Sequence, residues 1–306
     1  MEPIKNVAVC GAGAIGASYA AMFSDASGFS TVLVAKDQRY DRLKSEGLVI
    51  NKKKYSIPVV HPDEAVPPAD LILVALKNHD LPGAVHDLKN LVGNQTIVMS
   101  VMNGLDSEDY LGSVYGMDKL LYAIAVGIDA LREGNSVTYT TSGKIVFGEA
   151  ENSHPSERVL RVQNAFDRAG IKFETPTDMI RALWWKFMVN VGINQASAVM
   201  RAPYGVFQSS PEARALVDTL MQEVIVLAAR EGVNLVEKDL DDWNAVLNTI
   251  SPKGKTSMLQ DIEAGRKTEV DVFGGKAVEL GKKHNVPTPV NQTFLSIIHV
   301  LEQYRP

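Results

Sequence analysis

The sequence contains very little cysteine: Cys10 is its only one among 306 residues. A single thiol cannot form an internal disulfide, so we expect a reducing compartment. Cys10 closes a valine-rich run, which favours a small core residue. The sequence also lacks an apolar run of about 18 residues, the length that a membrane-spanning helix needs. Nor does its N-terminus show the basic-then-apolar order of a signal peptide. We therefore expect a cytoplasmic protein without a membrane segment.

An excess of positive charge is absent as well. Lysine and arginine number 31 against 36 aspartate and glutamate residues, which gives a net charge of −5. This balance argues against a nucleic acid or an anionic membrane as the main partner. With 45% hydrophobic and 22% charged residues, the composition is that of an ordinary globular protein. The length suits about two domains with a substantial core.

A glycine-rich turn near the N-terminus is the first feature that points to a function. The valine-rich run at 5–10 ends at Gly11-Ala12-Gly13-Ala14-Ile15-Gly16, and a helical pattern follows. In this motif the glycines permit a tight turn, a close approach of the backbone to a pyrophosphate, and packing of the helix on the strand. The pyrophosphate would lie at the helix N-terminus, where free N–H groups favour anions. The order of strand, glycine turn and helix predicts a dinucleotide-binding site.

The choice of dinucleotide depends on the residues after the second predicted strand. About 20 residues beyond the glycine turn, an acidic residue would bind the ribose hydroxyls of NAD. This chain has Lys36 there, and a cation suits the 2′-phosphate of NADP. Arg39 and Arg42 add positive charge, whereas the alternative interpretation uses Asp37 as the ribose ligand. The charge balance favours NADP.

Two continuous apolar runs, 70–76 and 96–101, predict buried parallel strands. They are followed by Lys77 and by Asn103-Gly104. Ligands of open α/β sheets bind at the carboxyl ends of the strands, so Lys77 and Asn103 should share an edge with the glycine turn. The simpler interpretation of an Asn-Gly pair is a turn without further function. A helix is expected between the two strands, at 80–91.

The remaining pattern predicts two domains. A hairpin is expected at 48–60, and strands at 120–128, 136–141 and 144–147 predict antiparallel additions to the parallel sheet. From Pro176 onward only helical periodicity remains. We therefore expect a Rossmann-type α/β domain over residues 1–176 and an all-helical domain over 177–306. A ligand cleft between the two domains is the usual arrangement.

A helix predicted at 179–200 opens the second domain and is apolar nearly all round, as a fully buried helix would be. Three polar residues, Lys186, Asn190 and Asn194, interrupt it at intervals of four residues and so share one stripe. A structural interpretation makes Lys186 a snorkelling side chain and the asparagines partners of neighbouring helices. The functional interpretation is a cleft wall with a cationic acid and two amides.

A second polar stretch lies at 256–271. Thr256 or Ser257 is expected to cap a short helix, and a hydroxyl at a helix start can also bind a carboxylate. Thr268 followed by Asp271 resembles a variant capping box, which would make Glu269 a first-turn acid favoured by the helix dipole.

Together these segments resemble the ketopantoate reductase (2-dehydropantoate 2-reductase) family. The likeness covers essentially the whole chain, in the same order and at compatible spacings, and it is most specific around Lys186 and Glu269. It implies an N-terminal Rossmann-type domain and an all-α domain like the C-terminal domain of 6-phosphogluconate dehydrogenase. It further implies an NADP-dependent oxidoreductase acting on CH–OH groups, which reduces ketopantoate to (R)-pantoate in pantothenate and coenzyme A biosynthesis. The partner would be a small 2-keto acid, no metal is expected, and a homodimer is the candidate assembly.

The resemblance also implies roles for individual residues. The residue matching Lys186 is the family's general acid, and the one matching Glu269 completes the catalytic and substrate site. Substrate contacts or the network that holds the site are implied for Asn103, Asn190, Asn194 and Ser257. Cofactor contacts are implied for Gly11, Ala12, Gly13, Ala14, Ile15, Gly16, Lys36, Lys77, Asn103 and Glu269.

Two departures from the family pattern lie close to the expected site. Gly274-Gly275 stands where Asn-Gly is common, and Gln195 follows Asn194 where proline is frequent. A reductase of another 2-keto acid is therefore the first alternative. A β-hydroxyacid dehydrogenase also pairs a glycine turn with a helical-domain lysine, but the segment 257–269 favours the keto acid reductase. A non-catalytic NADP-binding sensor would need the glycine turn and no buried lysine.

Overall fold

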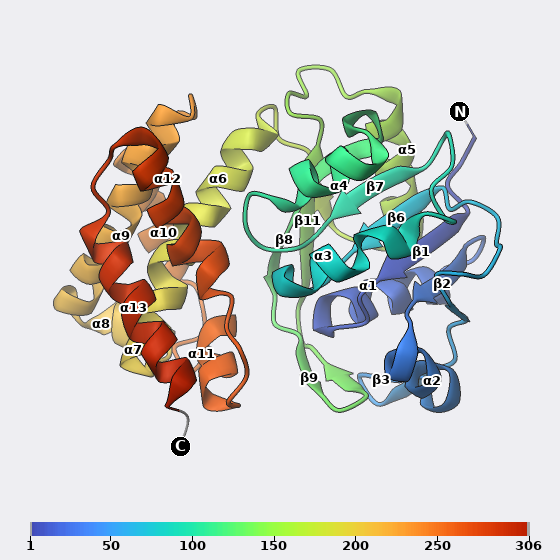
Figure 1. Ribbon diagram of the computed structural model, residues 1–306, viewed down its shortest axis with the longest axis horizontal. Helices are drawn as coiled ribbons and strands as arrows, with labels where there is room; N and C mark the ends of the chain where they lie inside the picture. The colour runs from blue at the N-terminus through green and yellow to red at the C-terminus, as the bar shows by residue number, and fades with distance from the viewer. Residues whose placement is uncertain (1, 305–306) are drawn as a thin grey trace. The chain divides into compact units, whose positions relative to one another are not determined.

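The computed structural model describes residues 2–304, and its chain forms two compact units. The first unit ends at Ile180 and the second begins at Arg181. Figure 1 follows the chain from the blue N-terminal strands to the red C-terminal helices.

The first unit is built on an eight-stranded sheet with the strand order β12-β11-β8-β7-β6-β1-β2-β5. All neighbouring strands are parallel except β8 and β11, which run antiparallel. The strands are β1 (Asn6–Cys10), β2 (Ser30–Val34), β5 (Val59–Val60), β6 (Leu71–Val74), β7 (Ile97–Ser100), β8 (Leu120–Ile128), β11 (Ser142–Gly148) and β12 (Phe173–Glu174). Every residue of β6 and β7 is buried, as in a parallel sheet covered on both faces.

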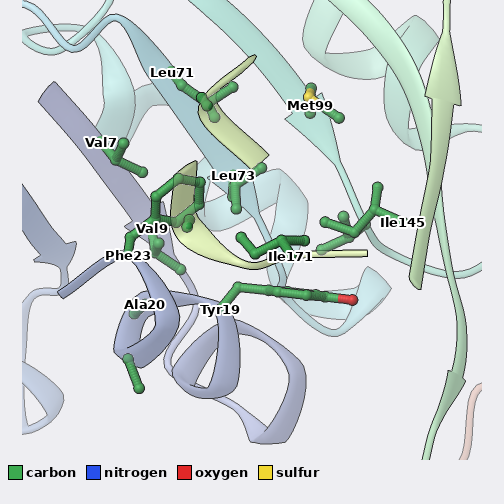
Figure 2. Packing of buried hydrophobic residues seen from close by; sticks show 14 of the residues in the cluster. Val7, Val9, Tyr19, Ala20, Phe23, Leu71, Leu73, Met99, Ile145 and Ile171 are labelled. Carbon is green, nitrogen blue, oxygen red and sulfur yellow. The ribbon is translucent and has the colours of Figure 1, made fainter. Parts of the chain in front are cut away.

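Successive residues of β1 belong to different hydrophobic clusters on the two faces of the sheet. Val7 and Val9 join one cluster, whereas Ala8 and Cys10 join the other, because successive strand residues point to opposite faces. Burial raises the pKa of the Cys10 thiol to about 12, which confirms that it is a core residue. Figure 2 shows the first cluster, with Val7, Val9, Tyr19, Ala20, Phe23, Leu71, Leu73, Met99, Ile145 and Ile171 labelled.

A second, four-stranded sheet has the order β4-β3-β10-β9. Its strands are β3 (Leu48–Ile50), β4 (Lys53–Tyr55), β9 (Leu131–Glu133) and β10 (Ser136–Thr138). The predicted hairpin is present as β3 and β4, and β11 extends the main sheet antiparallel to β8 as expected. A strand is present within 136–141 as β10, but its expected addition to the main sheet was wrong, because β10 pairs with β3 and β9 instead. Two long-range backbone bonds fix that pairing, Val49 N–H to Asn135 C=O and Asn51 N–H to Val137 C=O.

The helices of the first unit are α1 (Ala14–Asp25), α2 (Asp37–Glu46), α3 (Leu81–Ala84), α4 (Ser107–Tyr115) and α5 (Glu157–Ala169), with 3₁₀ turns η1 (Asn78–Asp80), η2 (Val85–Leu88) and η3 (Met117–Lys119). The single helix predicted at 80–91 was wrong, because the chain forms only one α-helical turn between η1 and η2. Pro82 and Gly83 lie in that turn, and both residues disfavour a continuous helix.

The described residues of the second unit contain helices and no strand. They are α6 (Met179–Val189, of which the first two residues still belong to the first unit), α7 (Gln195–Met200), α8 (Tyr204–Ser209), α9 (Pro211–Arg230), α10 (Lys238–Leu247), α11 (Ser257–Glu263), α12 (Lys276–His284) and α13 (Pro289–Gln303), with π-helical turns η4 (Asn190–Asn194) and η5 (Asp271–Gly275). The helix predicted at 179–200 therefore contains a π turn in its middle. Within residues 2–304 no helix combines the length and apolarity required to cross a membrane.

The boundary between the units lies slightly beyond the predicted Pro176 because the following residues are still bonded to the first unit. Asn152 Nδ2 donates to the carbonyl of Pro176 at 2.9 Å, and the Asn152 N–H donates to Thr177 C=O at 2.7 Å. The Met179 N–H then donates to Ala150 C=O at 3.0 Å. These bonds hold the first residues of α6 to the α/β unit.

Candidate functional site

Three predicted site segments share one edge of the main sheet. In the strand register Cys10 lies opposite Val74, and Val74 lies opposite Ser100, so β1, β6 and β7 end level with one another. The glycine turn, Lys77 and Asn103 directly follow these strands. The structure therefore brings them to the carboxyl edge at which open α/β sheets bind ligands.

The glycine turn packs so closely that two of its glycines have no room for a side chain. Gly11 has φ +101°, and a Cβ there would lie 2.5 Å from the carbonyl oxygen of Ala75. A Cβ at Gly16 would lie 2.9 Å from Ala75 Cβ, so this glycine lets α1 pack on the turn after β6. A Cβ at Gly13 would meet nothing closer than 3.9 Å. Gly13 is the N-cap of α1 and no side chain caps that end, so the first-turn N–H groups are left for another acceptor.

Lys36, the predicted 2′-phosphate ligand, already has two partners. It is the N-cap residue of α2, and its ammonium donates to Gly83 C=O and to Asp87 Oδ1, both at 3.0 Å. The side chain is still 41% exposed, so it remains accessible to a ligand. Asp37 is exposed, with φ +52°, and Arg39 is exposed beside it. The positive charge predicted from the sequence is present, but Lys36 already forms an ion pair with Asp87.

Arg132 contacts the glycine turn, and the sequence analysis did not identify it as a candidate site residue. From β9, its Nη1 donates to the carbonyl of Ala12 in the glycine turn, 120 residues away in the chain. Burial and the charges of Arg42 and Arg39 lower the pKa of Arg132. The sequence holds no local signal for this contact, because it depends on how the second sheet is placed against the glycine turn.

Asn103 lies in a sharp turn after β7, in which Gly104 has φ +102°. Its carbonyl accepts a hydrogen bond from Asn78 Nδ2 at 3.4 Å. Asn78 directly follows Lys77, so the turn after β6 and the turn after β7 are tied to each other. Lys77 and Asn103 are thus held on linked backbone segments.

In the helical unit, Lys186 lies half-buried in α6 between buried residues such as Trp184 and Phe187. Burial of the ammonium lowers the pKa of Lys186 to about 8. Asn190 and Asn194 open and close the π turn, and Asn194 Nδ2 donates to Asn190 Oδ1 at 3.1 Å. Single π turns inside α-helices occur frequently at functional sites. The structure therefore joins the two amides directly, one turn beyond the lysine.

Ser257 and Glu269 lie on segments next to this π turn. Thr256 is the actual cap of α11, because its Oγ1 accepts from the Leu259 N–H at 3.1 Å, and Ser257 is left exposed as the first helical residue. Glu269 is 7% exposed and stands just before the helical segment containing η5. Both α11 and η5 pack against η4. The helical unit thus gathers the segments that carry its five predicted site residues.

The predicted capping box around Glu269 is half present: Thr268 Oγ1 accepts a hydrogen bond from the Val270 N–H at 3.2 Å, but the Thr268 N–H does not pair with Asp271. The Thr268 N–H donates to Glu302 Oε1 at 2.6 Å, so the carboxylate that satisfies it comes from α13. Asp271 instead pairs with His299 Nε2 at 2.9 Å. A tertiary contact replaces the local one because α13 brings its own acid and imidazole to this helix start.

Across residues 2–304, no group of three or more His, Cys, Asp or Glu side chains is arranged to hold a metal ion.

Comparison with protein families gives matches in both units. A model described as "Ketopantoate reductase PanE/ApbA" matches residues 7–152, and one described as "Ketopantoate reductase PanE/ApbA C terminal" matches residues 178–302. A curated relative, the 2-dehydropantoate 2-reductase of Aquifex aeolicus (strain VF5), is 26% identical over 309 residues, which cover 98% of each chain.

Solved structures agree with the expected fold class, a Rossmann-type domain followed by a helical one. A PanE/ApbA family ketopantoate reductase from Ralstonia eutropha JMP134 has a TM-score of 0.85 at 26% identity, with 98% of this chain and 99% of that chain covered. D-mandelate dehydrogenase, solved with NADH and anilino(oxo)acetate, has a TM-score of 0.88 at 22% identity over 97% and 98% of the two chains. The latter likeness concerns the fold.

Proposed function

The chain belongs to the ketopantoate reductase family, and on this premise we propose that it reduces 2-dehydropantoate (ketopantoate) to (R)-pantoate with NADPH. Its class is that of oxidoreductases acting on CH–OH groups. The proposed step belongs to pantothenate and coenzyme A biosynthesis. The observation that carries the proposal is Lys186, a half-buried cation with a pKa lowered to about 8, one turn before the bonded pair Asn190 and Asn194.

The proposed cofactor site is the sheet edge of the first unit. The dinucleotide supplies the hydride, so the chain must hold and orient it. The uncapped start of α1 and the open space at Gly13 fit a pyrophosphate. Lys36, with Arg39 and Arg42 near it in sequence, favours a 2′-phosphate and therefore NADPH over NADH. Lys77 and Asn103, on their linked turns, complete the proposed cofactor contacts, and Asn103 is also a proposed hydrogen-bond partner of the substrate.

The helical unit supplies the proposed proton donor and substrate contacts. As hydride reaches the keto carbon, the carbonyl oxygen gains negative charge, and a cation within hydrogen-bond reach stabilises and protonates it. With its pKa lowered to about 8, Lys186 is charged at neutral pH and releases its proton more readily than an exposed lysine. Asn190 would hold the ammonium, Ser257 would bind the substrate carboxylate, and Glu269 would complete the substrate site.

The second candidate is reduction of another 2-keto acid. It is favoured by Gln195 and Gly274, two departures from the family pattern that lie in or beside the π turns of the helical unit. A change there alters the space near Asn194 without touching Lys186. The class of reaction stays the same and the side chain of the accepted keto acid changes.

The test is NADPH oxidation by the purified protein with ketopantoate and with 2-keto acids carrying smaller and aromatic side chains. A much higher kcat/KM for ketopantoate supports the first proposal. Turnover confined to another 2-keto acid overturns the named substrate in favour of the second candidate. Oxidation of 3-hydroxy acids by NADP⁺ without turnover of any of these keto acids, or no turnover of either kind, overturns both. The homodimer expected from the sequence is tested separately by light scattering of the same preparation.

A further inference from the structure

A buried acid in the first unit has no part in the function proposed above. Glu108 is the second residue of α4 and only 2% exposed, and its neighbours Ser107 and Ser100 are 2% and 0% exposed. Burying a carboxylate costs free energy unless hydrogen bonds compensate it. The helix dipole stabilises an acid in the first turn even when that acid is exposed to solvent. The dipole alone therefore does not explain why Glu108 is buried.

Glu108 ends a chain of hydrogen bonds that begins at the turn after β7. Ser107 Oγ donates to Glu108 Oε2 at 2.8 Å, and Ser107 Oγ lies 2.7 Å from Ser100 Oγ. The Met102 N–H donates to Ser100 Oγ at 3.3 Å. Since the single proton of Ser107 goes to the carboxylate, Ser107 must accept from Ser100. Every bond in the chain therefore points from the Met102 amide towards Glu108.

The chain reaches the backbone directly beside a predicted site residue. Ser100 is the last residue of β7, and Met102 immediately precedes Asn103. On its other side, Asn103 is tied through its carbonyl to Asn78. The Glu108 chain is thus one of the attachments that fix the turn carrying Asn103.

We propose that Glu108 is a positioning residue for Asn103, acting through Ser107 and Ser100 on the Met102 amide. The carboxylate orients both hydroxyls, and Ser100 then holds the turn so that the Asn103 side chain faces the ligand edge of the sheet. This inference rests on the role of Asn103 in the function proposed above. It adds a residue that touches neither substrate nor cofactor.

The ionisation of Glu108 gives the proposal a measurable signature. Burial raises its pKa to about 7, against the opposing effect of Ser107 and of the backbone N–H groups of Glu108 and Ala123. Asp109 raises the pKa of Glu108 further, and the charge of Glu108 in turn acts on Tyr122 of β8. The elements η2 and η3 also pack against α4, and they carry His86, Asp87, Asp118 and Lys119. Below a pH of about 7 the carboxyl becomes protonated and no longer draws the Ser107 proton as strongly.

The experiment compares Glu108→Gln with the exposed neighbour Asp109→Asn as the matched control. With saturating NADPH, Glu108→Gln should raise KM for the keto acid roughly threefold to tenfold, the effect of misaligning one substrate hydrogen bond. In the native protein KM should rise as the pH falls through about 7, and this dependence should vanish in Glu108→Gln. Asp109→Asn should keep the native KM above pH 7 and keep a pH-dependent KM, with the rise moved to lower pH because Asp109 raises the pKa of Glu108. A native KM and pH profile in Glu108→Gln would overturn the proposal.

A double-variant cycle separates positioning from a general loss of structure. In an Asn103→Ala background, Glu108→Gln should produce no further rise in KM, because its effect passes through Asn103. An additive rise would contradict the proposal. If Glu108→Gln does not fold, Ser100→Ala breaks the same chain with the carboxyl intact and should give the same KM rise; a native KM would count against the chain.

Amide hydrogen exchange tests the same series of hydrogen bonds, from Met102 to Glu108, without requiring catalysis. The Met102 amide should exchange faster in Glu108→Gln and Ser100→Ala than in Asp109→Asn at the same pH. If the native protein reduces no keto acid and this difference is still seen, the proposed function fails while the bond chain stands. If turnover is present and Met102 exchange is unchanged in both variants, the positioning role fails while the proposed function stands.

Discussion

The side-chain oxygen of Gln195 fills the space beside the α-carbon of Gly274. A Cβ at position 274 would lie inside van der Waals contact of Gln195 Oε1 and 3.0 Å from its Cδ. Gln195 is fully buried, and its Nε2 is fixed by Val191 C=O at 2.7 Å and by Asn291 Oδ1 at 2.8 Å. The two departures from the family pattern therefore form one packed unit, in which glycine at 274 accommodates glutamine at 195.

Gly274→Ala should destabilise the protein by about 1–3 kcal/mol, the usual cost of overpacking a filled core. Gly275→Ala is the matched control, since a Cβ there meets nothing closer than 3.6 Å. Alanine at 275 should be neutral or stabilising, because it replaces a glycine inside a helical segment. Gln195→Ala should remove most of the penalty of Gly274→Ala, which denaturant unfolding of the double variant measures. Equal stability of the two single alanine variants would refute the packing argument.

Lys186→Met should lower kcat by at least ~10²-fold, the range for loss of a positioned general acid. Methionine keeps the apolar stem and removes the charge, so NADPH affinity and the unfolding midpoint should change little. Single-turnover kinetics with the keto acid, together with a binding titration, measure these quantities. A folded methionine variant with a near-native rate would make Lys186 a structural lysine.

The pH dependence of kcat/KM should report the same residue. Lys186 donates a proton only in its charged form, so the rate should be highest below its pKa and fall as pH rises through about 8. The direction follows from desolvation, which disfavours the charged lysine and moves its pKa down towards neutrality. If the residual activity of Lys186→Met shows the same fall of kcat/KM at alkaline pH, that fall must come from the titration of another group.

Cofactor preference should respond differently to two basic residues. Lys36→Glu should narrow or reverse a preference for NADPH by tenfold or more, because a charge-assisted phosphate contact contributes roughly 1.5–3 kcal/mol. Arg132→Ala should weaken NADPH and NADH alike, since its contact in the protein is with Ala12 of the glycine turn. Fluorescence titration with both cofactors distinguishes the two patterns. Equal native affinity for NADPH and NADH would refute the proposed 2′-phosphate site.

Ser257→Ala should raise KM for the keto acid and leave NADPH affinity nearly unchanged, because only a substrate hydrogen bond is removed. Thr256→Ala provides a contrast within the same helix start. This substitution removes the hydroxyl that caps α11 by accepting from the Leu259 N–H, and it should lower the free energy of unfolding by about 1 kcal/mol. Weakened NADPH binding with a native KM in Ser257→Ala would contradict the substrate assignment.

The sequence by itself determined the fold class and the family. Apolar runs ending in the glycine turn, Lys77 and Asn103 predict parallel strands, and such strands present their carboxyl ends at one edge. The stripe of Lys186, Asn190 and Asn194 is likewise set by helical periodicity. These features depend on residues close together in the chain, so a local pattern was sufficient to predict them.

Only the tertiary structure decided which polar groups are paired. Asp87 pairs with the ammonium of Lys36, Arg132 donates to Ala12 C=O, and Glu302 replaces Asp271 as the acceptor for the Thr268 N–H. The π turn at 190–194 also appears only in the folded helix, where it joins Asn190 to Asn194. Each pairing, and the burial of Glu108 with its two serines, depends on which distant surfaces pack together. Buried polar groups then bond to the partners that this packing brings within reach, in preference to those that are near in sequence.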